Sequence, residues 1–277
     1  MECTVTCLVD NRTSALGLTA EHGLSFLICY RGRKYLFDTG QTNLIFHNAE
    51  KLGIDLTDLD GLIISHGHFD HTGGVADLLK RLKRKIPIYL HPQALEPKYL
   101  KIKDDKFREI GFGLTEMDIK ELGGNLIFNK EPVQVTPGLW LTGEIPRTAE
   151  FELPEPHFFS EQKGKIEHDP IPDDQAVVLE TGRGLVVVLG CAHTGIINTL
   201  NWIKKFKGKE KIYAVLGGTH LMAADEERIQ KTIEALAGYQ IERLGVCHCT
   251  GFPAAAHLFS AFKEKFLPLE VGTIFSC

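Results

Sequence analysis

The sequence has no long hydrophobic run and no excess of basic residues. No stretch approaches the roughly 20 consecutive apolar residues that a helix needs to cross a bilayer, so we expect no membrane partner. The 277 residues include 31 Lys and Arg against 36 Asp and Glu, which gives a formal net charge of -5. A long polyphosphate backbone requires a positive field, so this balance also predicts no extended nucleic-acid partner.

Cysteines are few and irregularly placed. There are seven of them, an odd number without regular spacing. This usage is typical of reduced thiols in a cytoplasmic protein and argues against a disulfide framework. The first ten residues also lack the basic start and apolar core of an export signal and are typical of a first strand. We therefore expect a cytoplasmic location.

The composition is that of a globular protein. Hydrophobic residues make up 43% and charged residues 24% of the chain, which excludes a disordered, collagen-like or coiled-coil protein. The length suits one large α/β domain. We expect a single domain over residues 1–277, with an irregular, insertion-like region at about 93–172, where prolines accumulate and the hydrophobic periodicity weakens.

Two stretches of alternating strands and helices flank this irregular region. In the first, the pattern predicts strands at Thr4–Val9, Leu24–Tyr30, Lys34–Phe37, Gly61–Ile64 and Ile86–Leu90, and helices at Asn43–Leu52 and Val75–Lys83. In the second, it predicts strands at Ala176–Glu180, Leu185–Leu189, Ile212–Leu216, Ile241–Val246 and near Val271, and helices at Asp225–Leu236 and Ala254–Phe266.

The most informative segment is a histidine-rich loop after the Gly61–Ile64 strand. His66 and His68 lie two residues apart, so in an extended chain both side chains reach the same side and one metal ion. Asp70 and His71 are adjacent, and a turn into the next helix would bring both toward a second ion. Imidazole and carboxylate groups are ligands for zinc, iron and manganese. The loop therefore predicts a metal centre.

Three more histidines follow strands in the second half of the chain. His193, His220 and His248 come after the strands that end at Leu189, Leu216 and Val246. Strand ends of an α/β sheet share one edge, so these side chains can complete the metal sites. Each histidine alone is also compatible with a hydrogen-bonded core imidazole. His220 is the weakest ligand candidate, and we expect it to protonate a leaving group instead.

The segment Ser65–Gly74 resembles the signature of the metallo-β-lactamase superfamily, whose members share a four-layer αββα sandwich and usually a dinuclear metal centre. The resemblance covers essentially the whole chain. A narrower resemblance, to the subfamily related to archaeal dihydropterin ribofuranosylaminobenzene 5′-phosphate synthase, rests on Thr142–Arg147, Asp173–Ala176, Gly190–His193, Gly217–Leu221 and His248–Gly251. It implies an α/β (α+β) sandwich and pterin-like chemistry.

Carried over residue by residue, the superfamily pattern implies two divalent ions, zinc before iron or manganese. Their ligands would be His66, His68 and His193 for the first ion, and Asp70, His71 and His248 for the second. One position departs from the pattern, because the strand that usually supplies a bridging aspartate ends in Gly190-Cys191 here. Either Cys191 takes that place as a thiolate, or His193 does, or no protein bridge exists. The favoured interpretation is that Cys191 is a small buried hydrophobe.

Other polar residues have supporting roles in this interpretation. Asp70 would orient the attacking water as well as bind metal, and Arg147 would clamp a phosphate, because its planar guanidinium matches phosphate oxygens. Asp38 and Asp173-Asp174 are candidates to hydrogen-bond a metal-binding imidazole. A structural zinc site at Cys247-His248-Cys249 is disfavoured, since no second cysteine pair lies nearby.

These residues predict a metal-dependent hydrolase or transferase. Two neighbouring ions can lower the pKa of a bound water and stabilise both the attacking and the leaving oxygen. We expect a small phosphorylated or pterin-like substrate, converted by hydrolysis or by a condensation that releases pyrophosphate. One alternative is a phosphodiesterase or nuclease of the same superfamily. Another is a non-catalytic, metal-binding ligand sensor.

Overall fold

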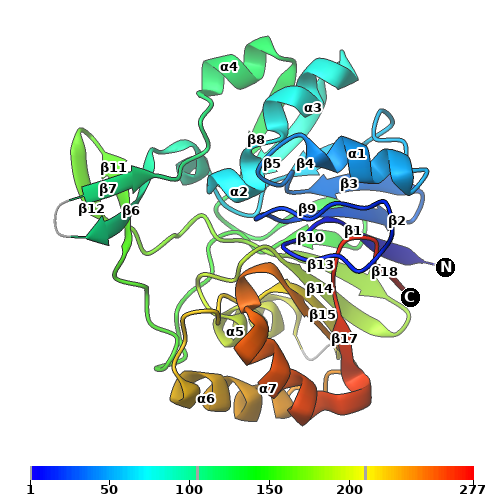
Figure 1. Cartoon of the computed structure of the whole chain (residues 1–277), viewed down its shortest axis with the longest axis vertical. Helices are drawn as coiled ribbons and strands as arrows, with labels where there is room; N and C mark the ends of the chain where they lie inside the picture. Colours follow the sequence, from blue (N-terminus) through cyan, green and yellow to red (C-terminus); the bar gives the residue numbers. More distant parts are fainter. Residues whose placement is uncertain (1, 104–105, 209–210) are drawn as a thin grey trace.

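Two seven-stranded sheets face each other in the computed structural model, which describes residues 2–103, 106–208 and 211–277. In the first sheet the strand order is β18-β1-β2-β3-β4-β5-β8. Its strands are β1 (Cys3–Val9), β2 (Ser25–Tyr30), β3 (Arg33–Phe37), β4 (Gly61–Ile63), β5 (Ile86–Leu90), β8 (Gly124–Phe128) and β18 (Ile274–Ser276). On its outer face lie α1 (Leu44–Lys51) and α3 (Val75–Leu82) (Figure 1).

The second sheet has the strand order β17-β16-β15-β14-β13-β10-β9. Its strands are β9 (Val133–Thr136), β10 (Leu139–Leu141), β13 (Val177–Thr181), β14 (Gly184–Leu189), β15 (Ile212–Gly218), β16 (Arg243–Cys247) and β17 (Phe266–Pro268). The helices α5 (Ile196–Lys207), α6 (Glu226–Ala237) and α7 (Phe252–Phe262) cover its outer face (Figure 1). The expected four-layer αββα order is therefore confirmed.

The strand β14 shows why the sequence produces these layers. Its residues form a continuous apolar run because both faces of the strand are buried. Val186 and Val188 belong to the core between the two sheets, whereas Val187 packs in the core between its sheet and the helices. Successive side chains of a strand point to opposite faces, so one apolar strand contributes to two cores.

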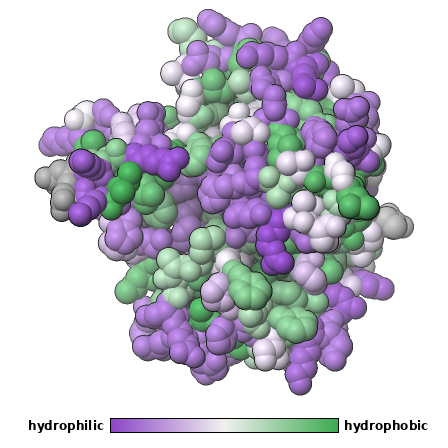
Figure 2. Space-filling model, in the orientation of Figure 1, coloured by the Kyte–Doolittle hydropathy of each residue, from purple (hydrophilic) through white to green (hydrophobic). Residues whose placement is uncertain are grey.

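The region at about 93–172 is more ordered than expected. It supplies the outer strands of both main sheets, α4 (Glu116–Glu121), and a third sheet of order β12-β11-β6-β7. The strands of this third sheet are β6 (Lys98–Lys103), β7 (Lys106–Glu109), β11 (Phe158–Gln162) and β12 (Lys165–His168), and they project to the left in Figure 1. Figure 2 shows hydrophobic side chains among hydrophilic ones on this projecting sheet, where Ile102 is 63% exposed.

Some of the expected helices and strands are confirmed, and others differ in their bounds or are missing. The hairpin between β13 and β14 is confirmed as an antiparallel pair. The helix α5 is missing from the expected elements, and the expected helix to Phe266 is wrong at its end, because the chain turns at Lys263 and continues into β17. The terminal strand lies at Ile274–Ser276, beyond Val271. Among the described residues, no helix is long and apolar enough to cross a membrane.

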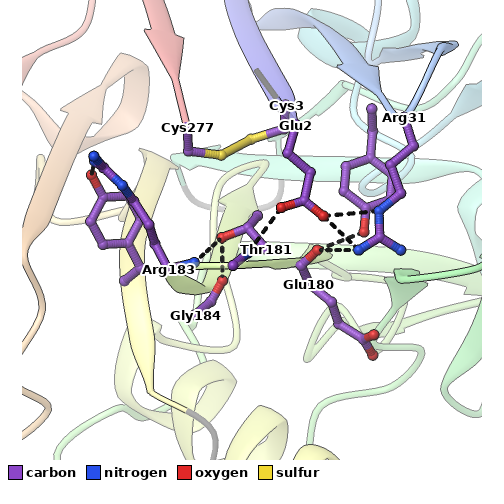
Figure 3. The surroundings of a disulfide bond; sticks show 11 residues. Glu2, Cys3, Arg31, Glu180, Thr181, Arg183, Gly184 and Cys277 are labelled. Atoms are coloured by element: carbon purple, nitrogen blue, oxygen red, sulfur yellow. Dashed lines mark hydrogen bonds and ion pairs between the residues drawn. A yellow bond between two sulfur atoms is a disulfide. The ribbon is translucent and has the colours of Figure 1, made fainter.

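Cys3 and Cys277 form a disulfide bond, so the expectation of reduced thiols is wrong for this pair. The bond joins the neighbouring strands β1 and β18 across a sequence separation of 274 residues (Figure 3). Beside it, Glu2 pairs with Arg31 at 2.6 Å and accepts a hydrogen bond from the Gly182 backbone. Cysteine count and spacing could not reveal this pair, because only the strand order brings the two ends of the chain together.

We predict that Cys3→Ser destabilises the protein by about 2–5 kcal/mol, since the bond closes a very long loop of the unfolded chain. Chemical denaturation followed by circular dichroism measures this change, with Cys29→Ser as a control at a free, partly buried cysteine. A thiol titration of the denatured, unreduced protein should find five free thiols. Finding all seven cysteines of the chain reactive would contradict the bond.

Candidate metal centre

The expected ligands come together at one edge of the two facing sheets. His66 and His68 follow β4, and Asp70 and His71 lie in the short helix α2 (Phe69–Thr72). His193 follows β14, and His248 begins a turn directly after β16. The strand ends of both sheets therefore supply the cluster, as the β/α pattern predicts.

The first group consists of His66, His68 and His193, whose candidate ligand atoms all lie within 4.8 Å of one another. All three side chains are buried, and burial lowers the pKa of His68 to about 3 and the pKa values of His66 and His193 well below the usual value. The imidazoles are thus neutral, which is the form that binds metal.

This group also leaves buried nitrogen atoms without hydrogen-bond partners. They are Nε2 of His68 and both ring nitrogens of His193. Buried polar atoms without partners are costly and rare in folded proteins. A metal ion would take one ring nitrogen from each imidazole, including one of the two unpartnered nitrogens of His193, so the residues present fit the ion that the pattern implies.

The second group is built around Asp70. Its Oδ2 atom lies 3.3 Å from Nε2 of His248 and 3.7 Å from Nε2 of His71. Burial alone would raise the pKa of Asp70, but the neighbouring imidazoles, His71 first, hold it well below its usual value. A carboxylate and two imidazoles in this arrangement form a second suitable donor set for a divalent ion.

A further histidine, His22, was not identified from the sequence. Its Nε2 lies 3.2 Å from Oδ2 of Asp70, and together with Asp70 and His248 it forms another group that could hold an ion. The side chain is 54% exposed and comes from the loop between β1 and β2. No strand-end or spacing signal marks this position, so only the folded chain reveals it.

Asp38 orients the histidine-rich loop. Its Oδ2 accepts a hydrogen bond from Nδ1 of His71 at 2.7 Å, and its Oδ1 accepts one from the backbone of Ser65 at 2.7 Å. The expected hydrogen bond between Asp38 and an imidazole of the cluster is therefore confirmed. Burial alone would lower the pKa of His71, but Asp70 and Asp38 raise it to about 9. The bond fixes the ring so that Nε2 faces the cluster.

The Asp173 side chain supports the histidine-rich loop by bonding the loop backbone, not an imidazole. Its Oδ2 accepts a hydrogen bond from the Gly67 backbone at 2.8 Å, and its Oδ1 pairs with the buried Lys98 at 2.8 Å. Lys98 also pairs with Asp169. At Gly67 a Cβ atom would lie 2.0 Å from the carbonyl oxygen of Ala94, so only glycine fits between His66 and His68.

Several positions with strained backbone lie at this centre. Four non-glycine residues here have positive φ, namely Asp38 at 61°, Ala192 at 53°, His220 at 49° and His248 at 50°. Such conformations cost free energy and persist where the surrounding structure enforces them, which is common at functional sites. The strain is therefore a second sign, independent of residue type, that these loops form a site.

His220 lies beside the first group but bonds elsewhere. Its ring centroid is 4.0 Å from that of His193, while its Nε2 pairs with Glu155 at 2.8 Å. Burial alone would lower the pKa of His220, but bonds to Cys249 and Glu155 raise it to about 10. Its role as an acid stays a prediction, and its position at the edge of a cavity is compatible with that role.

A cavity of about 500 Å³ has His220 among its lining residues. Its wall combines apolar side chains such as Phe151 and Leu153 with Glu155 and Arg228. The Nε atom of Arg228 is buried and has no hydrogen-bond partner among the described residues. This cavity is therefore a candidate substrate pocket next to the metal cluster.

Arg147 is placed differently from the phosphate clamp expected. Its two terminal nitrogens donate to the backbone carbonyls of Glu152, Thr194, Pro170 and His193, at 2.9–3.1 Å. Substrate binding by Arg147 stays a prediction, but these bonds support another role. The guanidinium holds the loop that carries His193, and so positions a candidate ligand of the first group.

We predict that Arg147→Ala weakens metal binding at the first group and destabilises the protein by about 2–4 kcal/mol, because several carbonyls lose a charged donor. Competition with a chelator measures the first effect and denaturation the second. Arg243→Ala is the matched control, since the side chain of this exposed arginine donates to the neighbouring Glu242 carbonyl and does not contact the cluster. Unchanged metal affinity with a raised KM would instead support the phosphate clamp.

Comparison with known proteins agrees with this geometry. Residues 18–203 match the family model of the metallo-beta-lactamase superfamily. A 7,8-dihydropterin-6-methyl-4-(beta-D-ribofuranosyl)-aminobenzene-5′-phosphate synthase of Methanocaldococcus jannaschii is 34% identical, over 92% of this chain and 90% of that protein. A crystal structure described as a metal-dependent hydrolase of the beta-lactamase superfamily matches with a TM-score of 0.85 and 30% identity, over 99% of both chains. The chain belongs to the metallo-beta-lactamase superfamily.

Proposed function

We propose that this protein is a metal-dependent enzyme that acts on a small phosphorylated or pterin-like molecule, either by hydrolysis or by a condensation that releases pyrophosphate. The observation that carries the proposal is the set of buried imidazole nitrogens without partners beside a cavity. Neutral, unpartnered imidazoles suit metal binding, and the cavity offers room for a small molecule.

The ligand sets follow the two groups of the cluster. His66, His68 and His193 would hold one divalent ion, and Asp70, His71 and His248 the other. Two bound ions would supply Lewis-acid stabilisation of charge on the reacting oxygens. Zinc is the first choice for sites of imidazole and carboxylate, with iron or manganese as alternatives.

The protein's own groups would bind and orient the substrate. The apolar wall at Phe151 and Leu153 suits a flat or partly apolar body, and Arg228 suits an anionic group. His220 lines this cavity and its ring centroid lies 4.0 Å from that of His193, so His220 would hold or donate a proton at the leaving group. The pterin-related name of the 34% identical relative favours the pterin-like class.

Two alternatives differ from this proposal in testable ways. A phosphodiesterase or nuclease would share the metal cluster but not the need for a pterin. A ligand sensor would bind metal and ligand without turnover. We also infer a cytoplasmic location, because five cysteines are free thiols.

The direct test combines metal analysis with a substrate screen. We expect two divalent ions per chain and turnover of a dihydropterin pyrophosphate, measured as released phosphate or pyrophosphate. Asp70→Ala should lose the second ion and lower turnover at least ~100-fold, because an oxygen ligand is gone. Asp77→Ala, at an exposed acidic side chain of α3, is the control. Turnover of phosphodiesters alone supports the nuclease, and metal binding without any turnover supports the sensor.

His220→Ala tests the proton donor. We expect kcat to fall by about 10²–10⁴-fold, the usual contribution of a general acid, with both ions retained. The exposed His257 on α7 provides a matched His→Ala control. Loss of one equivalent of metal from the His220 variant would assign His220 to the metal ligands instead.

A further inference from the structure

Cys191 lies at the centre of the cluster rather than in an apolar core. Its side chain is buried, and its Sγ is 3.1 Å from Nε2 of His71. The same sulfur is shared by three of the groups whose ligand atoms lie within 4.8 Å of one another: with His66 and His71, with His193 and His220, and with His248 and Cys249. No other residue in the described part of the chain belongs to as many of these groups.

This sharing places Cys191 between the two ions proposed above. His66 and His193 belong to the first ligand set, whereas His71 and His248 belong to the second. A sulfur within reach of both sets occupies the position that a bridging ligand requires. The expectation that Cys191 is merely a small buried hydrophobe does not account for the imidazole and thiol groups near its sulfur, since an inert thiol in a core is normally surrounded by apolar groups.

Cys249 adds a second sulfur on the side of His248. Its Sγ accepts a hydrogen bond from the backbone of His220 at 3.3 Å and lies 3.5 Å from the carbonyl oxygen of Cys191. A Cβ atom on Gly218 would lie 2.6 Å from this sulfur, so the glycine makes room for it. Cys247, two residues earlier, packs in the apolar core between the sheets. The turn after β16 thus separates a core thiol from one at the cluster.

We propose that the metal centre is sulfur-ligated, with the Cys191 thiolate shared between the two ions and Cys249 as an additional ligand beside His248. This inference rests on the two-ion centre of the proposed function and specifies its donors. Thiolates favour soft or borderline ions, so the centre selects zinc or iron and disfavours manganese. The cluster therefore differs from one built on nitrogen and oxygen alone.

Cobalt titration tests the sulfur ligands without relying on activity. The metal-free protein, reduced and then freed of reductant, is titrated with Co²⁺, and bound metal is counted by elemental analysis. Thiolate bound to Co²⁺ produces a charge-transfer absorption in the near ultraviolet, which imidazole and carboxylate do not. We expect this band together with two equivalents of bound cobalt.

Variants assign the band to each sulfur. Cys249→Ser should lower its intensity, and the Cys191→Ser/Cys249→Ser double variant should abolish it. Cys191→Asp, which replaces the thiolate with a carboxylate, should keep both ions and lose most of the band. Cys29→Ser, at a free cysteine outside the cluster, should leave it unchanged. Circular dichroism identifies any variant that fails to fold, and the single variants then decide.

Three results would overturn the inference. Two bound cobalt ions without the band would exclude sulfur ligands while leaving the proposed enzyme intact. A band that persists in the folded double variant would assign it to other groups. Failure of the wild-type protein to bind any cobalt or zinc would contradict both this inference and the proposed function.

Discussion

The structure depends on burying neutral imidazoles where few protein partners can satisfy them. His66, His68 and His193 follow strands of two different sheets, and their candidate ligand nitrogens lie within 4.8 Å of one another. Burying a ring nitrogen costs free energy unless another group binds its lone pair. Metal binding, as proposed above, would offset this cost.

The rest of the centre keeps these rings in place. Asp38 fixes His71, the Lys98–Asp173 pair holds the loop at Gly67, and Arg147 holds the carbonyls of the His193 loop. These groups come from separate parts of the chain and act on loops at the ends of strands. His220 and His248 have positive φ, a backbone conformation that non-glycine residues rarely adopt. Tertiary contacts at the site therefore hold these loops against their intrinsic conformational preference.

Much of the fold could be predicted because its signals are local. Strands such as β14 are continuous apolar runs, and the spacing of His66 and His68 is visible in the sequence itself. The helix α5 was harder to identify because its N-cap residue is Gly195, which provides no side-chain cap. The third sheet was missed because strands such as β7 have no buried position and carry no apolar alternation.

The site shows the same division. The expected ligands converge, but His22, Cys249 and the Cys3–Cys277 pair depend on contacts between distant segments. Arg147 carries the right chemistry for phosphate, yet its donors meet carbonyls that only the folded chain presents.

An anomalous-scattering crystal structure of zinc-loaded protein tests the central claim most directly. We expect one ion among His66, His68 and His193 and a second beside Asp70 and His248. Zinc bound elsewhere, with this cluster empty, would contradict the account.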